Sequence, residues 1–144
     1  MYLNGSQNRK DVDDIDRVLA DICQHIADTV DEVDVKYLMR SKGPIRLIEQ
    51  EASGPDRARL ILSQVVDELN ERPADLPRVD QLLMQLNSSS TAPCLMRELV
   101  TLQSGLLDHI GKEVPYVKLI INDRDEQLND RLGLTLLIWL SAKG

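Results

Sequence analysis

Apolar side chains recur every three or four residues from residue 11 to residue 33, which is the spacing that gathers them on one face of an α-helix. Aspartates occupy the first turns of this segment, where carboxylates stabilise the positive end of the helix dipole. A break near residues 28–31 and the Gly43-Pro44 pair delimit a second, shorter helix. The pattern predicts helices over residues 11–33 and 34–41, the first with the apolar face Val12, Ile15, Val18, Leu19, Ile22, Ile26, Val30 and Val33.

Further short helices are predicted for the middle of the chain. Pro44 suits the first turn of a helix that runs to residue 52 and ends before Gly54-Pro55. The clearest amphipathic segment covers residues 55–71, and we expect it to pack centrally. Two more helices are predicted over residues 79–86 and 93–111, with a polar loop at residues 87–91 between them.

The last segment is ambiguous between helix and strand. Residues 116–121 are rich enough in β-branched side chains for a strand. Residues 126–140 are predicted as a helix, because Leu128, Leu132, Leu136 and Trp139 follow one another at nearly helical steps. A two-stranded hairpin at the C-terminus is the alternative.

These elements predict an all-α fold, a bundle of six to seven short helices, with an α+β fold containing a C-terminal β-hairpin as the alternative. The 144 residues suffice for one domain with a full core. Only 3% of residues are aromatic and phenylalanine is absent, so the core must be aliphatic. We expect a flexible segment at residues 1–10, a helical bundle over 11–112 and a C-terminal extension over 113–144.

The charge and the cysteines limit the classes of function. A net charge of −7 argues against a general binder of nucleic acid or of anionic membranes, since both require a cationic face. No apolar run is long enough to span a bilayer, and the N-terminus lacks a signal-peptide core. Cys23 and Cys94 show neither a disulfide framework nor zinc-ligand spacing. The sequence therefore predicts a cytoplasmic protein from a reducing compartment.

The two ends of the chain resemble each other, and their sequences resemble segments of a known protein family. Residues 17–22 and 34–43 align with residues 117–121 and 136–144. The segment Asp34-Val35-Lys36-Tyr37-Leu38-Met39 is similar to the second helix of the death effector domain, and Leu137-Ile138-Trp139-Leu140 looks like a second copy. Residues 60–72 and 79–83 look like the third to fifth helices of that family. Two departures stand out: residues 86–95 lack the R-x-D-L charge element, and the second copy is incomplete.

The resemblance implies a death-fold bundle that acts as an adaptor or regulator of cell death or innate signalling by homotypic assembly. It places a partner-binding patch at Tyr37, Leu38 and Met39, to which we add Trp139 as a candidate anchor. Core packing is the alternative for all four side chains. The unfinished second copy predicts a homo-oligomer, with protein partners and without nucleic acid or membrane.

Residues for catalysis or for cofactor binding are scarce. His25 and His109 each lie within a predicted helix, and no sequence around Cys94 indicates a nucleophile. The glycines form no phosphate-binding loop, and residues 122–126 lack the spacing of a calcium-binding loop. We therefore predict no enzyme activity, no cofactor and no metal. A small acidic dimeric chaperone or assembly factor of bacterial or viral origin is the second hypothesis, and a small enzyme with an unrecognised pocket is the third.

Overall fold

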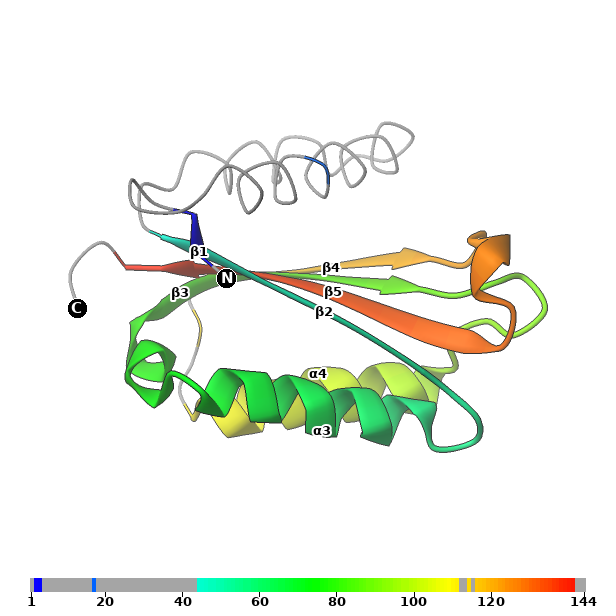
Figure 1. Ribbon diagram of the computed structural model, residues 1–144, viewed down its shortest axis with the longest axis horizontal. Coiled ribbons are helices and arrows are strands. Elements are labelled where there is room, and N and C mark those ends of the chain that lie inside the picture. Colours follow the sequence, from blue (N-terminus) through cyan, green and yellow to red (C-terminus); the bar gives the residue numbers. More distant parts are fainter. Residues whose placement is uncertain (1, 4–16, 18–43, 112–113, 115, 142–144) are drawn as a thin grey trace.

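The computed structural model describes residues 2–3, 17, 44–111, 114 and 116–141 of the chain. Its elements alternate between strands and helices (Figure 1). The strands are β1 (Tyr2–Leu3), β2 (Ile45–Ser53), β3 (Val79–Asn87), β4 (Tyr116–Asn122) and β5 (Arg131–Leu140). The helices are α3 (Arg57–Asn70) and α4 (Met96–Ile110), and the 3₁₀ turns are η1 (Pro73–Arg78) and η2 (Glu126–Leu128).

One mixed sheet organises the described residues, with the strand order β1-β2-β5-β3-β4. β5 lies between β2 and β3 and is antiparallel to both, so β2 and β3 run in the same direction. β3 and β4 pair in parallel, which requires a crossover such as α4. The last strand in the sequence is therefore a central strand of the sheet.

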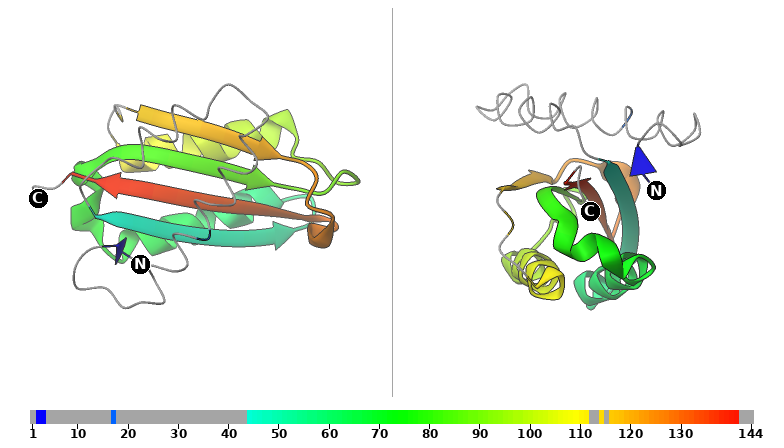
Figure 2. Two further views of the ribbon diagram at one scale, coloured as in Figure 1. Left: turned by 90° about the horizontal axis from the view of Figure 1, so that it is seen from above. Right: turned by 90° about the vertical axis from the view of Figure 1, so that its left-hand side faces the viewer.

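Both helices cover one face of this sheet (Figure 2). The apolar core lies between that face and the helices. α3 contributes Ile61, Val65 and Leu69, and α4 contributes Leu102 and Leu106. The strands contribute alternate residues, as the two-residue period of a strand requires. These are Ile48, Leu82, Met84, Leu86, Leu132, Leu134, Leu136 and Ile138.

The second face of the sheet changes character along the strands. One end is apolar and buried: Leu83, Leu137 and Trp139 have no exposed surface. The other end carries polar residues in two rows that run across the strands. The pairing registers align Glu49, Thr135 and Gln85 in one row, and Glu51, Gly133, Asn87 and Asn122 in the next.

The prediction of an all-α bundle is wrong, because the described core is built on a sheet. Residues 44–52 and 79–86, predicted as helices, form β2 and β3, and residues 126–140 form η2 and the strand β5. The alternative C-terminal hairpin is also not formed, since β4 pairs with β3 while β5 pairs with β2 and β3. The helices predicted over 55–71 and 93–111 are confirmed as α3 and α4. The helices predicted over 11–33 and 34–41 lie outside the described residues, except for Arg17.

Candidate functional site

The outer edge of β4 is a seven-residue strand edge with no partner strand among the described elements. At the other side of the sheet, the edge strand β1 has only two residues. An open edge presents unpaired N–H and C=O groups, which folded proteins normally protect with charges, proline or bulges. β4 has no proline, and its only charged residue is Lys118. This edge can therefore accept a further strand.

Exposed apolar side chains lie beside that edge. Ile121 of β4 is 52% exposed, and Met96 and Val100 of α4 are 73% and 52% exposed. Gly105 marks the side of α4 that faces α3, because a Cβ there would overlap the side chain of Leu62. Met96 precedes Gly105 by about two and a half helical turns, so it lies on the opposite side of α4.

In the right-hand view of Figure 2, α4 lies below the β4 side of the sheet and α3 below β2. The side of α4 that faces away from α3 therefore continues from the edge of β4. We call the open edge of β4, together with Met96, Val100 and Ile121, the β4 surface.

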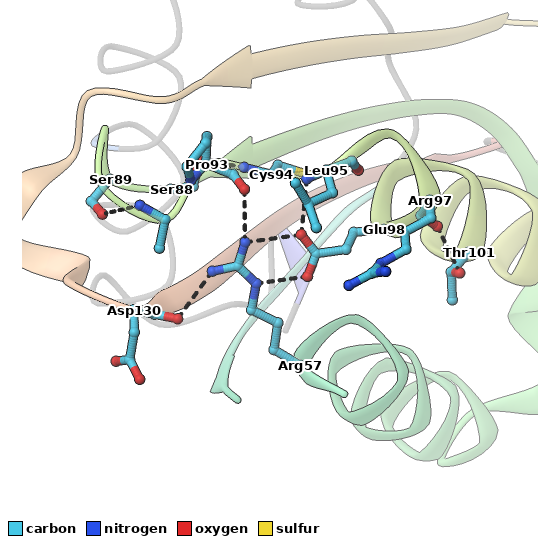
Figure 3. A network of polar contacts seen from close by, with 11 residues as sticks. Arg57, Ser88, Ser89, Pro93, Cys94, Leu95, Arg97, Glu98, Thr101 and Asp130 are labelled. Atoms are coloured by element: carbon cyan, nitrogen blue, oxygen red, sulfur yellow. Dashed lines mark hydrogen bonds and ion pairs between the residues drawn. The ribbon is translucent and has the colours of Figure 1, made fainter. Parts of the chain in front are cut away.

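A buried ion pair fixes the start of α4 and thus the position of Met96 (Figure 3). Arg57, at the first position of α3, donates from Nε to Glu98 Oε2 at 2.6 Å and from Nη2 to Glu98 Oε1 at 2.9 Å. Its guanidinium also donates to the carbonyl oxygens of Asp130 at 3.0 Å and Pro93 at 2.9 Å. Glu98 accepts in addition from the backbone N–H of Leu95 at 2.8 Å, which caps the helix. Arg57 therefore joins α3, the loop before α4 and the turn before β5.

The electrostatics of this pair favour the charged forms. The hydrogen bond from Arg57 lowers the pKa of Glu98, and burial opposes that shift without reversing it. The hydrogen bond to Glu98 in turn raises the pKa of Arg57. Both side chains are about 93% buried, so each charge depends on the other for its solvation.

The residues considered for chemistry do not form a catalytic group in the described part of the chain. Cys94 lies before α4, where burial raises the pKa of its thiol and so disfavours the reactive thiolate. His109 Nε2 lies 3.0 Å from Asn70 Oδ1, joining the ends of α4 and α3. His25 and Cys23 lie outside the described residues. Residues 44–111 and 116–141 contain no cluster of three or more metal-ligating side chains.

Trp139 is the only predicted partner-binding residue that the structure describes. It has no exposed surface and lies on the second face of the sheet, where its indole Nε1 lacks a hydrogen-bond partner. Contact with a partner would require its surroundings to open. Tyr37, Leu38 and Met39 lie outside the described residues, so the patch proposed there stays a prediction.

Sequence reasoning missed the β4 surface. The helix predicted over residues 93–111 contains Met96, but only the core positions of Glu98, Leu102 and Leu106 show that Met96 faces outward. Residues 116–121 were predicted to suit a strand because of their β-branched side chains, but only the topology shows that this strand lies at an edge.

Comparisons with known proteins show a fold rather than a family. No family model matches the chain, and no curated protein matches it. Two solved structures from M. jannaschii are similar. One, described as an FtsZ W319Y mutant, has a TM-score of 0.59 and 17% identity over 95% of this chain and 42% of its own. The other, described as an empty FtsZ dimer, has a TM-score of 0.55 and 17% identity over 77% of this chain and 31% of its own.

This chain therefore spans less than half the length of the structures it resembles, and the likeness concerns the fold alone. The resemblance to the death effector domain is wrong, because the fold is an α+β fold of the FtsZ type and not a helical bundle. The implied role in cell death or innate signalling is wrong with it, and the alternative role as a chaperone or assembly factor has no support. Within the described residues, no helix is both long and apolar enough to cross a bilayer.

Proposed function

We propose that this chain is a non-catalytic protein-association domain that pairs with a second copy of itself through the β4 surface. The observation that carries the proposal is the open, seven-residue edge of β4, with one charged side chain and exposed apolar neighbours. The description of one similar structure as a dimer supports the choice of a second copy as the partner.

The sequence of β4 is suited to pairing with itself. In an antiparallel pair whose twofold axis passes Leu119, Val117 lies opposite Ile121 of the second copy, and Leu119 lies opposite Leu119. All these side chains lie on the helix-covered face, since β4 is aligned with Leu82, Met84 and Leu86 of β3. On the second face, Lys118 lies opposite Ile120 of the second copy, so no like charges meet.

Such a pairing extends the sheet across the two copies and covers polar backbone groups that one copy leaves open. Each apolar cross-strand pair contributes roughly 0.2–1 kcal/mol. Met96 and Val100 of both copies would add apolar area beneath the joined edges. These small free-energy contributions add up to a reversible association, so the fraction of paired chains should depend on the protein concentration.

Position 120 provides a matched pair of variants. Ile120→Lys places a second cation opposite Lys118 of the other copy and should weaken association at least tenfold. Ile120→Glu places an anion at the same point and should preserve or strengthen it. Sedimentation equilibrium gives the dissociation constants, and circular dichroism checks that both variants keep the fold. A wild-type chain that stays monomeric at several hundred micromolar, or two variants that associate equally, would refute the proposal.

A further inference from the structure

Three sulfur atoms lie in the described part of the chain, in Met84, Cys94 and Met96. They differ widely in their access to solvent. Met84 belongs to the core between the sheet and the helices and is 1% exposed. Met96, the first residue of α4, is 73% exposed. A reagent in solution that attacks sulfur therefore reaches Met96 freely, and it reaches Met84 only when the core opens.

Cys94 is the less reactive neighbour of Met96. Its Sγ donates to the carbonyl oxygen of Leu95 at 3.6 Å, and burial raises the pKa of the thiol. Peroxides attack the thiolate, which a raised pKa makes scarce at neutral pH. The thioether of Met96 has no proton to lose, so its reactivity follows its exposure. Among these three sulfur atoms, the one in Met96 is therefore the most open to oxidation.

The fold holds Met96 in this exposed position. Glu98 is buried against Arg57 of α3 and accepts from the backbone N–H of Leu95, which fixes the start of α4 (Figure 3). Met96 precedes Glu98 by two residues, so its side chain points about 200° around the helix from that buried position. Val100 lies one turn beyond Met96 on the same outward face and is 52% exposed. Both side chains are part of the β4 surface.

Oxidation changes what this surface can bury. The lone pair of the thioether sulfur attacks one oxygen of a peroxide such as hydrogen peroxide; an S–O bond forms, the O–O bond breaks and the second oxygen leaves as water. The sulfur is oxidised, the peroxide is reduced, and an apolar side chain becomes a polar sulfoxide. In the single chain the sulfoxide stays hydrated, so the fold loses little. In the paired form it would lie beneath the joined strand edges, where a polar group without a partner is unfavourable.

We infer that Met96 is an oxidation site whose conversion to the sulfoxide by a peroxide switches off pairing through the β4 surface, an inference that rests on the proposed function. Because pairing is reversible, the unpaired chain presents Met96 to the peroxide, and the sulfoxide then keeps the chain unpaired. Methionine sulfoxide is reduced back to methionine by sulfoxide reductases, so the switch can be reset.

The selectivity of the reaction is tested by treating the full chain with hydrogen peroxide at pH 7 and following each methionine by peptide mass spectrometry. Met96 should gain one oxygen atom at least tenfold faster than Met84. Its rate should fall as the protein concentration rises through the range in which the chain associates, because pairing covers the sulfur. Equal rates for the two methionines would overturn the inference.

The effect on pairing is measured by sedimentation equilibrium before and after oxidation, once the peroxide has been removed with catalase. Oxidation should weaken association of the wild type at least fivefold and leave the melting temperature nearly unchanged. Met96→Leu keeps an apolar side chain of similar volume, so it should associate like the wild type and should not respond to peroxide. Met96→Gln places a polar side chain of similar length there and should weaken association without peroxide.

The leucine variant is the decisive control, because it keeps every other sulfur of the chain, including those of Cys23 and Met39 outside the described residues. Loss of association in this variant after peroxide treatment would assign the effect to another residue and overturn the inference. Wild type that associates equally before and after oxidation of Met96 would refute the inference alone. Wild type that does not associate even before treatment would refute the proposed function, and the inference with it.

Discussion

The guanidinium of Arg57 joins segments that are far apart in the sequence, since it binds Glu98, Pro93 and Asp130. Each of these acceptors belongs to a different segment, so one side chain holds together regions that are far apart in the chain. A buried charge of this kind is tolerated only because its partner is charged and its remaining N–H groups find acceptors.

Glu98→Gln should destabilise the fold by about 3 kcal/mol, because removing one partner of a buried ion pair leaves the other charge without compensation. The amide N–H groups of glutamine would also face the N–H groups of Arg57. Chemical denaturation at pH 7 measures the loss. Glu71→Gln, at an exposed glutamate just beyond α3, is the matched control and should change stability little.

The same carboxylate predicts a dependence on pH. The pKa of Glu98 is lower in the folded chain than in the unfolded one, so its contribution is complete above about 4.3, the ordinary pKa of glutamate. The contribution is lost as the pH falls through the lower, folded value. Denaturation between pH 7 and pH 3 should therefore show a smaller loss of stability for Glu98→Gln than for the wild type. Parallel curves for the two proteins would contradict this prediction.

Asn129 adopts a backbone conformation that favours glycine, with φ 55° and ψ −111°. Replacing Asn129 by glycine would relieve backbone strain of about 1–3 kcal/mol. The greater conformational entropy of glycine in the unfolded chain offsets part of this gain. Asn129→Gly should therefore raise the stability of the fold, by about 1 kcal/mol. Asn129→Ala should lower it, since alanine tolerates this conformation less well than asparagine. The melting temperatures of the two variants test this prediction, and equal shifts in both variants would contradict it.

At the scale of elements, the helices were predictable and the strands were not. α3 and α4 each bury one face, so their apolar residues keep the helical period that the sequence shows. β5 is buried at every position but its first, because it lies in the middle of the sheet with both faces covered. A strand buried on both faces loses its alternation, and its leucines can be read as a helix.

β3 was also predicted as a helix, because its apolar residues do not alternate strictly. Leu82, Leu83 and Leu86 follow helical spacing, yet Leu82 and Leu86 belong to the core beneath the sheet while Leu83 lies on the second face. The candidate sites were harder still to predict. The β4 surface, for example, depends on the strand order, which places β4 at an edge of the sheet although it lies between β3 and β5 in the sequence.

Val100→Glu tests the contribution of α4 to the β4 surface. Val100 is 52% exposed, so the change costs little burial, and glutamate has the higher helix propensity. The melting temperature should stay the same or rise, while self-association should weaken. Leu60→Glu is the matched control, since Leu60 is similarly exposed at 49% on α3. Equal effects of both variants in light scattering would show that charge alone, and not the β4 surface, governs association.

At the scale of the whole molecule, the order of the strands in space differs from their order in the sequence. β5 is synthesised last, yet it supplies the hydrogen-bond partners of both β2 and β3. The two pairings that join β2 and β3 into one sheet therefore require residues 131–140. Such non-local contacts are slow to form and make the fold cooperative.

Truncation after Gly111 should therefore unfold the chain, contrary to the expectation of a self-sufficient helical bundle ending near residue 112. The truncated chain loses both β4 and β5, so β2 and β3 lose the strand that joins them. It also loses the core side chains Leu132, Leu134, Leu136 and Ile138, each of which contributes about 1.5–3 kcal/mol when fully buried. Together these four side chains contribute about 6–12 kcal/mol, which is comparable to the 5–15 kcal/mol by which a domain is normally stable. Circular dichroism of the truncated chain should show no cooperative thermal transition, whereas the full chain should melt in one step. A cooperative transition in the truncated chain would mean that α3 and α4 form a stable core without the central strand.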